Sequence, residues 1–533
     1  MSSMVSDATS RAASPRRSLP DEVVDGARAR GAGASWRQLV LLLPVGAMLV
    51  VGLVGLDRRS MWRDEAASLV AADRSLAELW AMLAQLETVH ALYYTFLHAW
   101  MQLGSGVVWA RVPSVLAMAV AAGLVGVLGA RLASVRVGLV AGLLFVANPS
   151  TSFYAQEARS TAMIVAVALL ATWLLLRAEA RAGRRAAGWW VGYAVAGAVL
   201  VALNLLAVLV PLTHLLTLLW WRRPRSALLS WGLAVLPALA VAGTLALMTR
   251  SQPFQVGWIP APGPATVRDF VHLVLGPTVP LMALVAVLVL LGVLPVAAAR
   301  SRLTAVALPL LVAPFVALVA ASFVQPIFVA RYVFPSVPAA ALLAAAGVDR
   351  VGTWLAGRLA ARPDGRASGR RLATGAPALV AALAVALVAL GGLGTQRAER
   401  TPSSRPDDLA GAAAVVAAGA RSGDAVLFLP DNRRLVALVY PASFARTHDV
   451  ALSEGPVQAH NLTGRPLPLA SVEANLAGSP RVWVVGRPGL AVLPSETVAR
   501  SELAVLDHDF VPVETPDPHG VGITLYVRRS GTP

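Results

Sequence analysis

The first 394 residues alternate between long apolar runs and short polar segments. Each run is about as long as a bilayer crossing, which takes roughly 20 helical residues. Residues 187–221 form a continuous apolar stretch that is too long for one crossing, so we divide it at Asn204. The pattern predicts eleven membrane-spanning helices, at 37–56, 109–130, 137–153, 160–176, 187–203, 205–221, 227–248, 279–298, 303–323, 328–347 and 375–394.

The two ends of the chain lack such runs. Residues 1–35 are rich in Ser, Arg, Ala and Gly without apolar periodicity, which predicts a disordered cytoplasmic tail. Residues 395–533 have the composition of a soluble protein and begin with an Ala-rich helical segment at 407–420. Strand-like apolar runs follow at 425–429, 481–485 and 522–527. We therefore predict an all-α polytopic membrane domain over 36–394, with a large first outer loop at 57–108, and a small α/β domain over 395–533.

Composition excludes a soluble globular protein of this size. Hydrophobic residues make up 57% of the 533 residues and charged residues only 14%, and the mean hydropathy is +0.66. The chain contains no Cys, so disulfide bonds, zinc–thiolate sites and thiol nucleophiles are excluded.

The net charge of +16 belongs to the membrane part. Residues 1–394 carry 32 Arg and 15 acidic residues, whereas residues 395–533 carry 13 Arg and 14 acidic residues. Within the first part the Arg residues cluster in every second loop, which the positive-inside rule assigns to the cytoplasm. A nucleic-acid surface would gather charge on one folded face, so that class is excluded. We expect a multi-pass plasma-membrane protein with a cytoplasmic N-terminus and an extracytoplasmic C-terminal domain.

The loops predicted to face outward carry the candidate chemistry. Asp64 and Glu65 follow the first span by about eight residues. The alternative is a purely structural role, in which Asp64 would cap a short interfacial helix and Glu65 would complement the helix dipole in its first turn. The same loop contains His90, Tyr93 and Tyr94, for which packing at the membrane interface is the alternative. His90 and His98 without a matched carboxylate would make a weak metal site.

Two further outer segments place charged residues at the ends of spans. Glu157 and Arg159 precede the fourth span, and Arg331 and Tyr332 occur near the start of the tenth. Snorkelling explains an isolated Arg at a span end. Arg is disfavoured on the outer side, however, so these residues require partners, and a phosphate binds a guanidinium through two parallel hydrogen bonds.

The order of these motifs resembles that of the GT-C membrane glycosyltransferases. Within them the chain is most similar to the family 39 group, which includes protein O-mannosyltransferases and aminoarabinose transferases, especially its actinobacterial members. The resemblance covers roughly 36–350 well and the C-terminal domain only loosely. The motifs are W-x-DEA at 62–66, VHALYY at 89–94, ARVPSVLA at 110–117, YAQEAR at 154–159 and RY at 331–332.

The resemblance implies an inverting transfer of a sugar from a polyprenyl-phosphate donor to an acceptor at the outer membrane face. Asp64 would be the general base, Glu65 would orient it or the acceptor, and Arg159 and Arg331 would hold the leaving phosphate. The remaining candidates for substrate binding are His90, Tyr93, Tyr94, Glu157 and Tyr332. Many members have His-Pro-Pro where this chain has His90-Ala91-Leu92, a difference that concerns the shape of this loop and the role of His90.

The predicted partners are the lipid donor, membrane lipid and a glycan, lipid or protein acceptor, with mannose as the expected sugar. We assign no cofactor, and divalent metal dependence stays open. The alternative is a transporter or flippase of a lipid-linked sugar, which would place ionisable residues deep within the spans. Here the spans are nearly free of them, with His214 and the polar Asn204 as exceptions, and this favours the enzyme.

Overall fold

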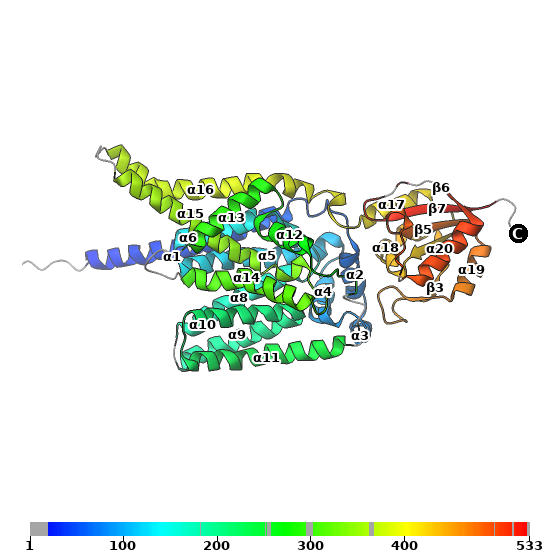
Figure 1. Cartoon of the computed structure of the whole chain (residues 1–533), viewed down its shortest axis with the longest axis horizontal. Helices are drawn as coiled ribbons and strands as arrows, with labels where there is room; N and C mark the ends of the chain where they lie inside the picture. Colours follow the sequence, from blue (N-terminus) through cyan, green and yellow to red (C-terminus); the bar gives the residue numbers. More distant parts are fainter. Residues whose placement is uncertain are drawn as a thin grey trace, which may run out of the picture.

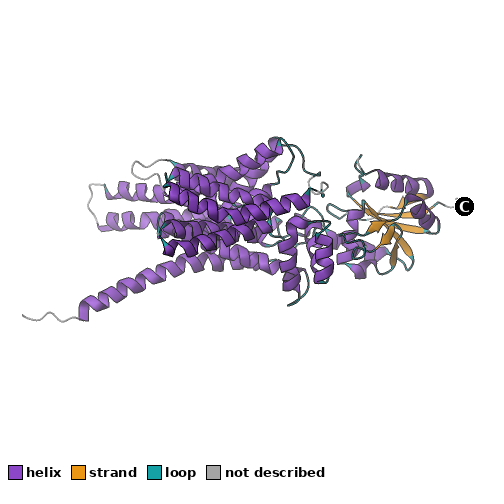
Figure 2. Ribbon diagram, turned by 90° about the horizontal axis from the view of Figure 1, so that it is seen from below, coloured by secondary structure: helices purple, strands orange, loops and turns teal. Residues whose placement is uncertain are grey.

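The computed structural model describes residues 20–181, 183–250, 252, 257–294, 302–361, 367–494, 496–513, 516 and 518–529. Its two parts are a helical bundle and a smaller domain containing a sheet, which lies at one end of the bundle and carries the C-terminus (Figures 1 and 2). Most of the tail predicted at 1–35 lies outside the described residues, because helix α1 (Pro20–Leu53) is described only from Pro20 onward.

Seven described helices are long and apolar enough to cross a membrane, and up to nine spans result if each of two bent helix pairs forms one. The seven are α5 (Val107–Leu132), α8 (Thr161–Glu179), α9 (Arg184–Leu203), α11 (Arg225–Thr249), α14 (Arg302–Ser322), α15 (Ser336–Ala360) and α16 (Ala367–Ala398). The bent pairs are α6 (Val135–Ala147) with α7 (Pro149–Ala155), at 67°, and α12 (Pro264–Leu275) with α13 (Val279–Val293), at 74°.

The polytopic helical fold is thereby confirmed. The two remaining predicted spans coincide with shorter apolar helices, Gln38–Leu53 within α1 and Leu205–Trp220, which comprises η2 (Leu205–Val208) and α10 (Leu209–Trp220). Residues 295–298 of the eighth predicted span lie outside the described part.

Two span boundaries differ from the prediction because of proline. The third span bends where Asn148 leaves the helix and Pro149 starts α7, since the Asn148 side chain accepts a hydrogen bond from the Ser150 amide at 2.8 Å and caps the new helix. The tenth span starts at Ser336 rather than at residue 328, with Pro335 as its N-cap. Arg331 therefore lies in a separate 3₁₀ turn, η4 (Ala330–Val333).

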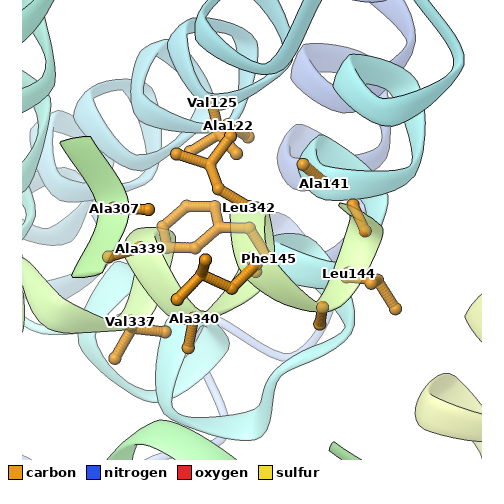
Figure 3. Close-up of a cluster of buried hydrophobic side chains, with 14 of the residues drawn as sticks. Ala122, Val125, Ala141, Leu144, Phe145, Ala307, Val337, Ala339, Ala340 and Leu342 are labelled. Atoms are coloured by element: carbon orange, nitrogen blue, oxygen red, sulfur yellow. The ribbon is translucent and has the colours of Figure 1, made fainter. Parts of the chain in front are cut away.

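The core of the bundle is made by small and branched residues on adjacent helices. Phe145 of α6 lies among Ala339, Ala340 and Leu342 of α15, with Val125 of α5 beside them (Figure 3). Lipid provides no hydrophobic driving force for the association of membrane helices, so their association depends on close packing. Small residues permit this packing because they let the helix backbones approach each other. Helices α13 and α15 use glycine for this purpose, because a methyl group on Gly347 would overlap the carbonyl oxygen of Leu288.

The C-terminal domain contains a five-stranded sheet in the order β2-β1-β5-β7-β6. Its strands are β1 (Asp424–Leu429), β2 (Thr447–Asp449), β5 (Arg481–Gly486), β6 (Phe510–Val513) and β7 (Gly522–Arg528). Strand β1 pairs in parallel with β2 and β5, and β7 runs antiparallel to β5 and β6. All six residues of β1 are buried, as expected of a strand covered on both faces. The three predicted strand-like runs coincide with β1, β5 and β7.

Helices complete the α/β domain. They are α17 (Leu409–Gly419), α18 (Leu435–Val439), α19 (Leu469–Ala477) and α20 (Thr497–Asp509). A short antiparallel pair, β3 (Leu452–Glu454) and β4 (Arg465–Pro466), stands apart from the sheet. The small α/β domain predicted after the last span is therefore present.

A layer of short helices lies between the bundle and the sheet domain (Figure 1). It consists of α2 (Arg63–Ala72), α3 (Leu76–Leu83), the 3₁₀ turn η1 (Thr88–His90) and α4 (Ala91–Met101). All four come from the loop predicted to face outward at 57–108. The assignment of this end of the bundle to the outer side of the membrane stays a prediction based on charge.

The close approach of α13 and α15 generates a stability prediction. Replacing Gly with Ala inside a helix normally stabilises it by up to about 1 kcal/mol. Gly347→Ala should instead destabilise the protein by about 1–3 kcal/mol, because the added methyl group overlaps backbone. Gly357→Ala is the matched control, since Gly357 lies in the same helix and its added methyl group would meet open space. Thermal unfolding of both variants in detergent tests this, and an equal or higher Tm for Gly347→Ala would contradict it.

Candidate functional site

Helix α2 brings Asp64 and Glu65 to the junction between the bundle and the sheet domain. Trp62 is the N-cap residue, with φ −117° and ψ 171°, and both carboxylates lie in the first turn. The alternative in which Asp64 caps the helix is therefore wrong. Because successive residues in a helix are rotated by about 100°, the two carboxylates point in different directions and have different surroundings.

Asp64 faces two guanidinium groups. Its Oδ2 atom accepts a hydrogen bond from Arg331 Nη1 at 2.8 Å and lies 3.9 Å from Arg159 Nη2. The side chain of Asp64 is 28% exposed, that of Arg331 19% and that of Arg159 11%, so solvent reaches all three. The structure thus brings together three of the predicted site residues, although Asp64 and Arg331 are separated by 267 positions in the chain.

Arg159 connects Asp64 to a second group of polar residues. One of its Nη1 hydrogen bonds goes to the hydroxyl of Tyr94, at 3.3 Å, and its Nη2 atom lies 3.2 Å from Nε2 of His90. The Tyr94 hydroxyl in turn donates to Glu87 Oε2 at 3.1 Å. His90 and Tyr94 therefore belong to the same site as Asp64.

Glu87 is a site residue that the sequence analysis missed. Its φ of +62° is unusual for a residue other than glycine, and such strained conformations concentrate at functional sites. The available signal was its position just before His90, at the start of the stretch that contains the two tyrosines.

Glu65 is fully buried and forms an ion pair. Arg111 Nε and Nη2 donate to its two carboxylate oxygens, both at 2.8 Å, and the amide of Ala158 donates to Oε1 at 2.9 Å. Arg111 is also fully buried. It lies within the ARVPSVLA motif, but the sequence analysis did not identify it as the partner of Glu65.

The remaining predicted residues lie around this site. Tyr93 is 1% exposed and belongs to the apolar cluster beneath α2 and α4. Glu157 is also 1% exposed, and its Oε1 atom lies 3.6 Å from Arg405 Nη1. The Tyr332 ring is partly buried, with the Arg331 guanidinium 5.7 Å from its centroid. None of these three makes a hydrogen bond to Asp64 that we observe among the described residues.

The surroundings shift the pKa values of the acidic groups in opposite directions. Burial by itself would raise the pKa of Asp64, but the positive charges of Arg159 and Arg331 outweigh burial and lower it. Burial raises the pKa of Glu87 despite Arg159 and Tyr94, and burial also raises the pKa of Glu157. Arginines thus keep Asp64 ionised, and Arg111 likewise lowers the pKa of Glu65 against the effect of burial.

The surroundings of His90 favour its neutral form. Burial, together with the nearby charges of Arg159 and Arg331, places its pKa well below 6.5.

Among the residues that the structure describes, nothing supports a metal site at the two histidines. His98 Nδ1 lies 3.0 Å from the carbonyl oxygen of Ala72. Within the described part of the chain, no three His, Asp or Glu side chains converge in a way that could hold a metal ion.

No protein-family model and no curated protein sequence matches the chain. Among solved structures, it is similar to that of ArnT from Cupriavidus metallidurans in the apo state. The TM-score is 0.59 at 16% identity, over 93% of this chain and 98% of that one. A second structure of the same protein, bound to undecaprenyl phosphate, gives a TM-score of 0.56 at 16% identity, over 92% and 98% of the two chains. The chain therefore has the GT-C fold, as the resemblance of its motifs predicted.

The contrast between the two adjacent carboxylates generates a second stability prediction. Glu65→Gln should lower the free energy of unfolding by about 3–5 kcal/mol, because it leaves the buried Arg111 without its counter-ion. Asp64→Asn should change it by less than about 1 kcal/mol, because Asp64, Arg159 and Arg331 are partly exposed. Thermal unfolding of the two variants measures the difference. Equal losses of Tm would show that the buried pair has no special structural role.

Proposed function

We propose that the chain is an inverting glycosyltransferase that moves a sugar from a polyprenyl-phosphate donor to a hydroxyl of a cell-envelope acceptor at the outer face of the membrane. The fold that it shares with ArnT supports this class of activity, and one ArnT structure contains undecaprenyl phosphate. We take mannose as the first sugar to test and leave the acceptor open to glycan, lipid and protein.

The observation that carries the proposal is the pairing of Asp64 with two arginines at the end of the bundle. A hydroxyl is a weak nucleophile and requires a positioned base, for which a carboxylate is suited. A lipid phosphate is already a stable anion when it leaves, so it requires cationic hydrogen-bond donors more than a proton. One carboxylate and two guanidiniums supply both functions within one group of contacts.

In the proposed reaction, the acceptor oxygen attacks the anomeric carbon from the side opposite the phosphate. The bond between that carbon and the phosphate oxygen breaks, and its electron pair leaves with the phosphate. Asp64 takes the proton of the acceptor hydroxyl, while Arg331 and Arg159 bind the phosphate oxygens. Inversion follows from this single displacement.

Donor binding also explains how a carboxylate held between two arginines can act as a base. In the free protein, Arg159 and Arg331 lower the pKa of Asp64. A phosphate bound to the same guanidiniums offsets their positive charge, so the pKa of Asp64 rises toward the value at which it accepts a proton well. The base would thus become effective only when the donor is bound.

The other predicted residues have supporting roles in this proposal. His90 and Tyr94 contact the Arg159 guanidinium and help to hold it in place, and Tyr332 lies beside Arg331. Glu65 positions α2 through Arg111 rather than contacting the acceptor, since it is completely enclosed. Tyr93 and Glu157 are buried as well, and their proposed role is to support the residues that contact the substrates.

The first test is sugar transfer by purified protein in lipid, with labelled polyprenyl-phosphate mannose and a panel of envelope acceptors, in the presence and absence of EDTA. The wild-type protein should form product, and Asp64→Asn should reduce kcat by at least about a thousandfold because the base is lost. Asp73→Asn is the matched control, since Asp73 is exposed at the other end of the same helix. Movement of the lipid-linked sugar between leaflets without any product would instead identify a flippase.

The pH dependence provides an independent test. Activity should fall as pH drops through the pKa of Asp64, because the base must be ionised. Arg331→Gln removes one of the positive charges that lower this pKa. The acid limb of the kcat/KM profile should therefore move to higher pH in Arg331→Gln than in the wild type. An unchanged acid limb would show that Asp64 is not the base whose titration sets this limb.

A further inference from the structure

The C-terminal domain packs against helix α2. Met61, Ala66 and Ala67, in and just before α2, share a continuous apolar core with Leu409 of α17 and Phe428 of β1. The remaining surface of the first turn of α2 faces Arg111 and the guanidiniums of the site. Helix α2 therefore lies between the sheet domain and the bundle and contacts both.

Backbone and side-chain hydrogen bonds join the start of α2 to the start of α17. The amide of Leu409 donates to the carbonyl oxygen of Met61 at 3.2 Å, and the amide of Ala410 donates to Ser60 Oγ at 3.1 Å. These bonds attach the segment that leads into α2 to the C-terminal domain.

An ion pair completes the connection at the residue beside Asp64. Arg63 Nε donates to Asp407 Oδ2 at 2.6 Å, and the second oxygen of Asp407 accepts from Arg433 Nη1 at 3.0 Å. Asp407 is 2% exposed and Arg433 is 5% exposed. Asp407 thus joins one arginine of α2 to one arginine within the sheet domain.

The opposite end of α2 is held by the same domain. Arg74, two residues beyond the helix, donates to the carbonyl oxygen of Pro456 at 3.1 Å and to that of Asn461. With ten residues and no side-chain cap at Trp62, α2 has little stability of its own, because isolated helices shorter than about 12–15 residues are marginal in water. Its position therefore depends on what it contacts.

We propose that Asp407 is a positioning residue of the active site: through Arg63, the C-terminal domain fixes the first turn of α2 so that the Asp64 carboxylate faces Arg331 and Arg159. This inference rests on the proposed function. It assigns the C-terminal domain a role inside the catalytic scaffold rather than that of a separate binding module. The reason is geometric, since Arg63 and Asp64 are adjacent and a small rotation of the first turn moves both side chains.

Two variants break the connection from opposite sides. Arg63→Gln removes the contact but leaves Asp407 paired with Arg433, so the interior of the domain stays intact. Asp407→Asn removes the shared carboxylate. Each should lower kcat by at least about tenfold, because small misplacements of reacting groups have large effects on rate, while KM for the donor stays within about twofold. The double variant should be no worse than the more affected single variant, because both substitutions break the same connection.

Charge by itself predicts a different result. Arg63 lowers the pKa of Asp64, so Arg63→Gln would raise that pKa. Asp407 offsets the charge of Arg63, so Asp407→Asn would lower it. An electrostatic effect would therefore shift the acid limb of the pH profile in opposite directions in the two variants, whereas a positioning effect lowers the plateau kcat in both.

Hydrogen–deuterium exchange of the full-length protein supplies a readout that does not require activity. Exchange in residues 62–72 should increase in both variants and stay unchanged in Glu496→Gln, the matched control. This control removes an ion pair between Glu496 and Arg487 inside the same domain, with both contacts at 2.6 Å. Glu496→Gln should also keep the wild-type kcat.

The outcomes separate this inference from the proposed function. Wild-type kcat and wild-type exchange in Arg63→Gln and Asp407→Asn would overturn the positioning role while the transferase activity stands. A loss that appears only as a raised KM, or additive losses in the double variant, would also overturn it. If the wild-type protein transfers no sugar but exchange in 62–72 increases in both variants, the proposed function fails and the structural dependence of α2 on Asp407 holds.

Discussion

The buried ion pair between Glu65 and Arg111 is the interaction on which the junction of the two parts depends. Moving two charges out of water is unfavourable, and such a pair is stable only when its remaining hydrogen-bonding groups are satisfied. Here they are. Arg111 makes five hydrogen bonds, two to Glu65 and one each to the carbonyl oxygens of Leu56, Arg59 and Ser60. A guanidinium has five N–H groups, so this environment matches its full capacity. The pair thereby joins α5, α2 and the segment between α1 and α2.

Asp64, the residue next to Glu65, has different surroundings from the buried pair. Its carboxylate is partly exposed and faces two guanidiniums that come from distant segments, one before α8 and one in η4. Neither arginine is fully buried, so solvent reaches both guanidiniums. Adjacent carboxylates in one helical turn therefore form one fully enclosed ion pair and one set of partly exposed ion pairs.

The sheet domain also holds α2 in place. Its apolar core continues into α2 through Met61, Ala66 and Ala67, and Asp407 links it to the residue beside Asp64. The sequence predicted a small α/β domain after the last span, but it did not predict the contact of this domain with α2. The domain covers the side of α2 that the bundle leaves exposed, and a ten-residue helix between two folded parts is held more firmly than one attached to either alone.

The sequence by itself determined the features that depend on local composition. The apolar runs set the membrane helices and the β1, β5 and β7 strands, because burial in lipid or in a sheet core is read from consecutive residues. Asp64, His90, Tyr94, Arg159 and Arg331 were identified through motifs, but their mutual contacts were not. Only the tertiary structure placed Arg331 against Asp64, Arg111 against Glu65 and Asp407 against Arg63, at separations of 267, 46 and 344 residues. Partners so far apart are chosen by the packing of helices around them, and no pattern along a single segment encodes that choice.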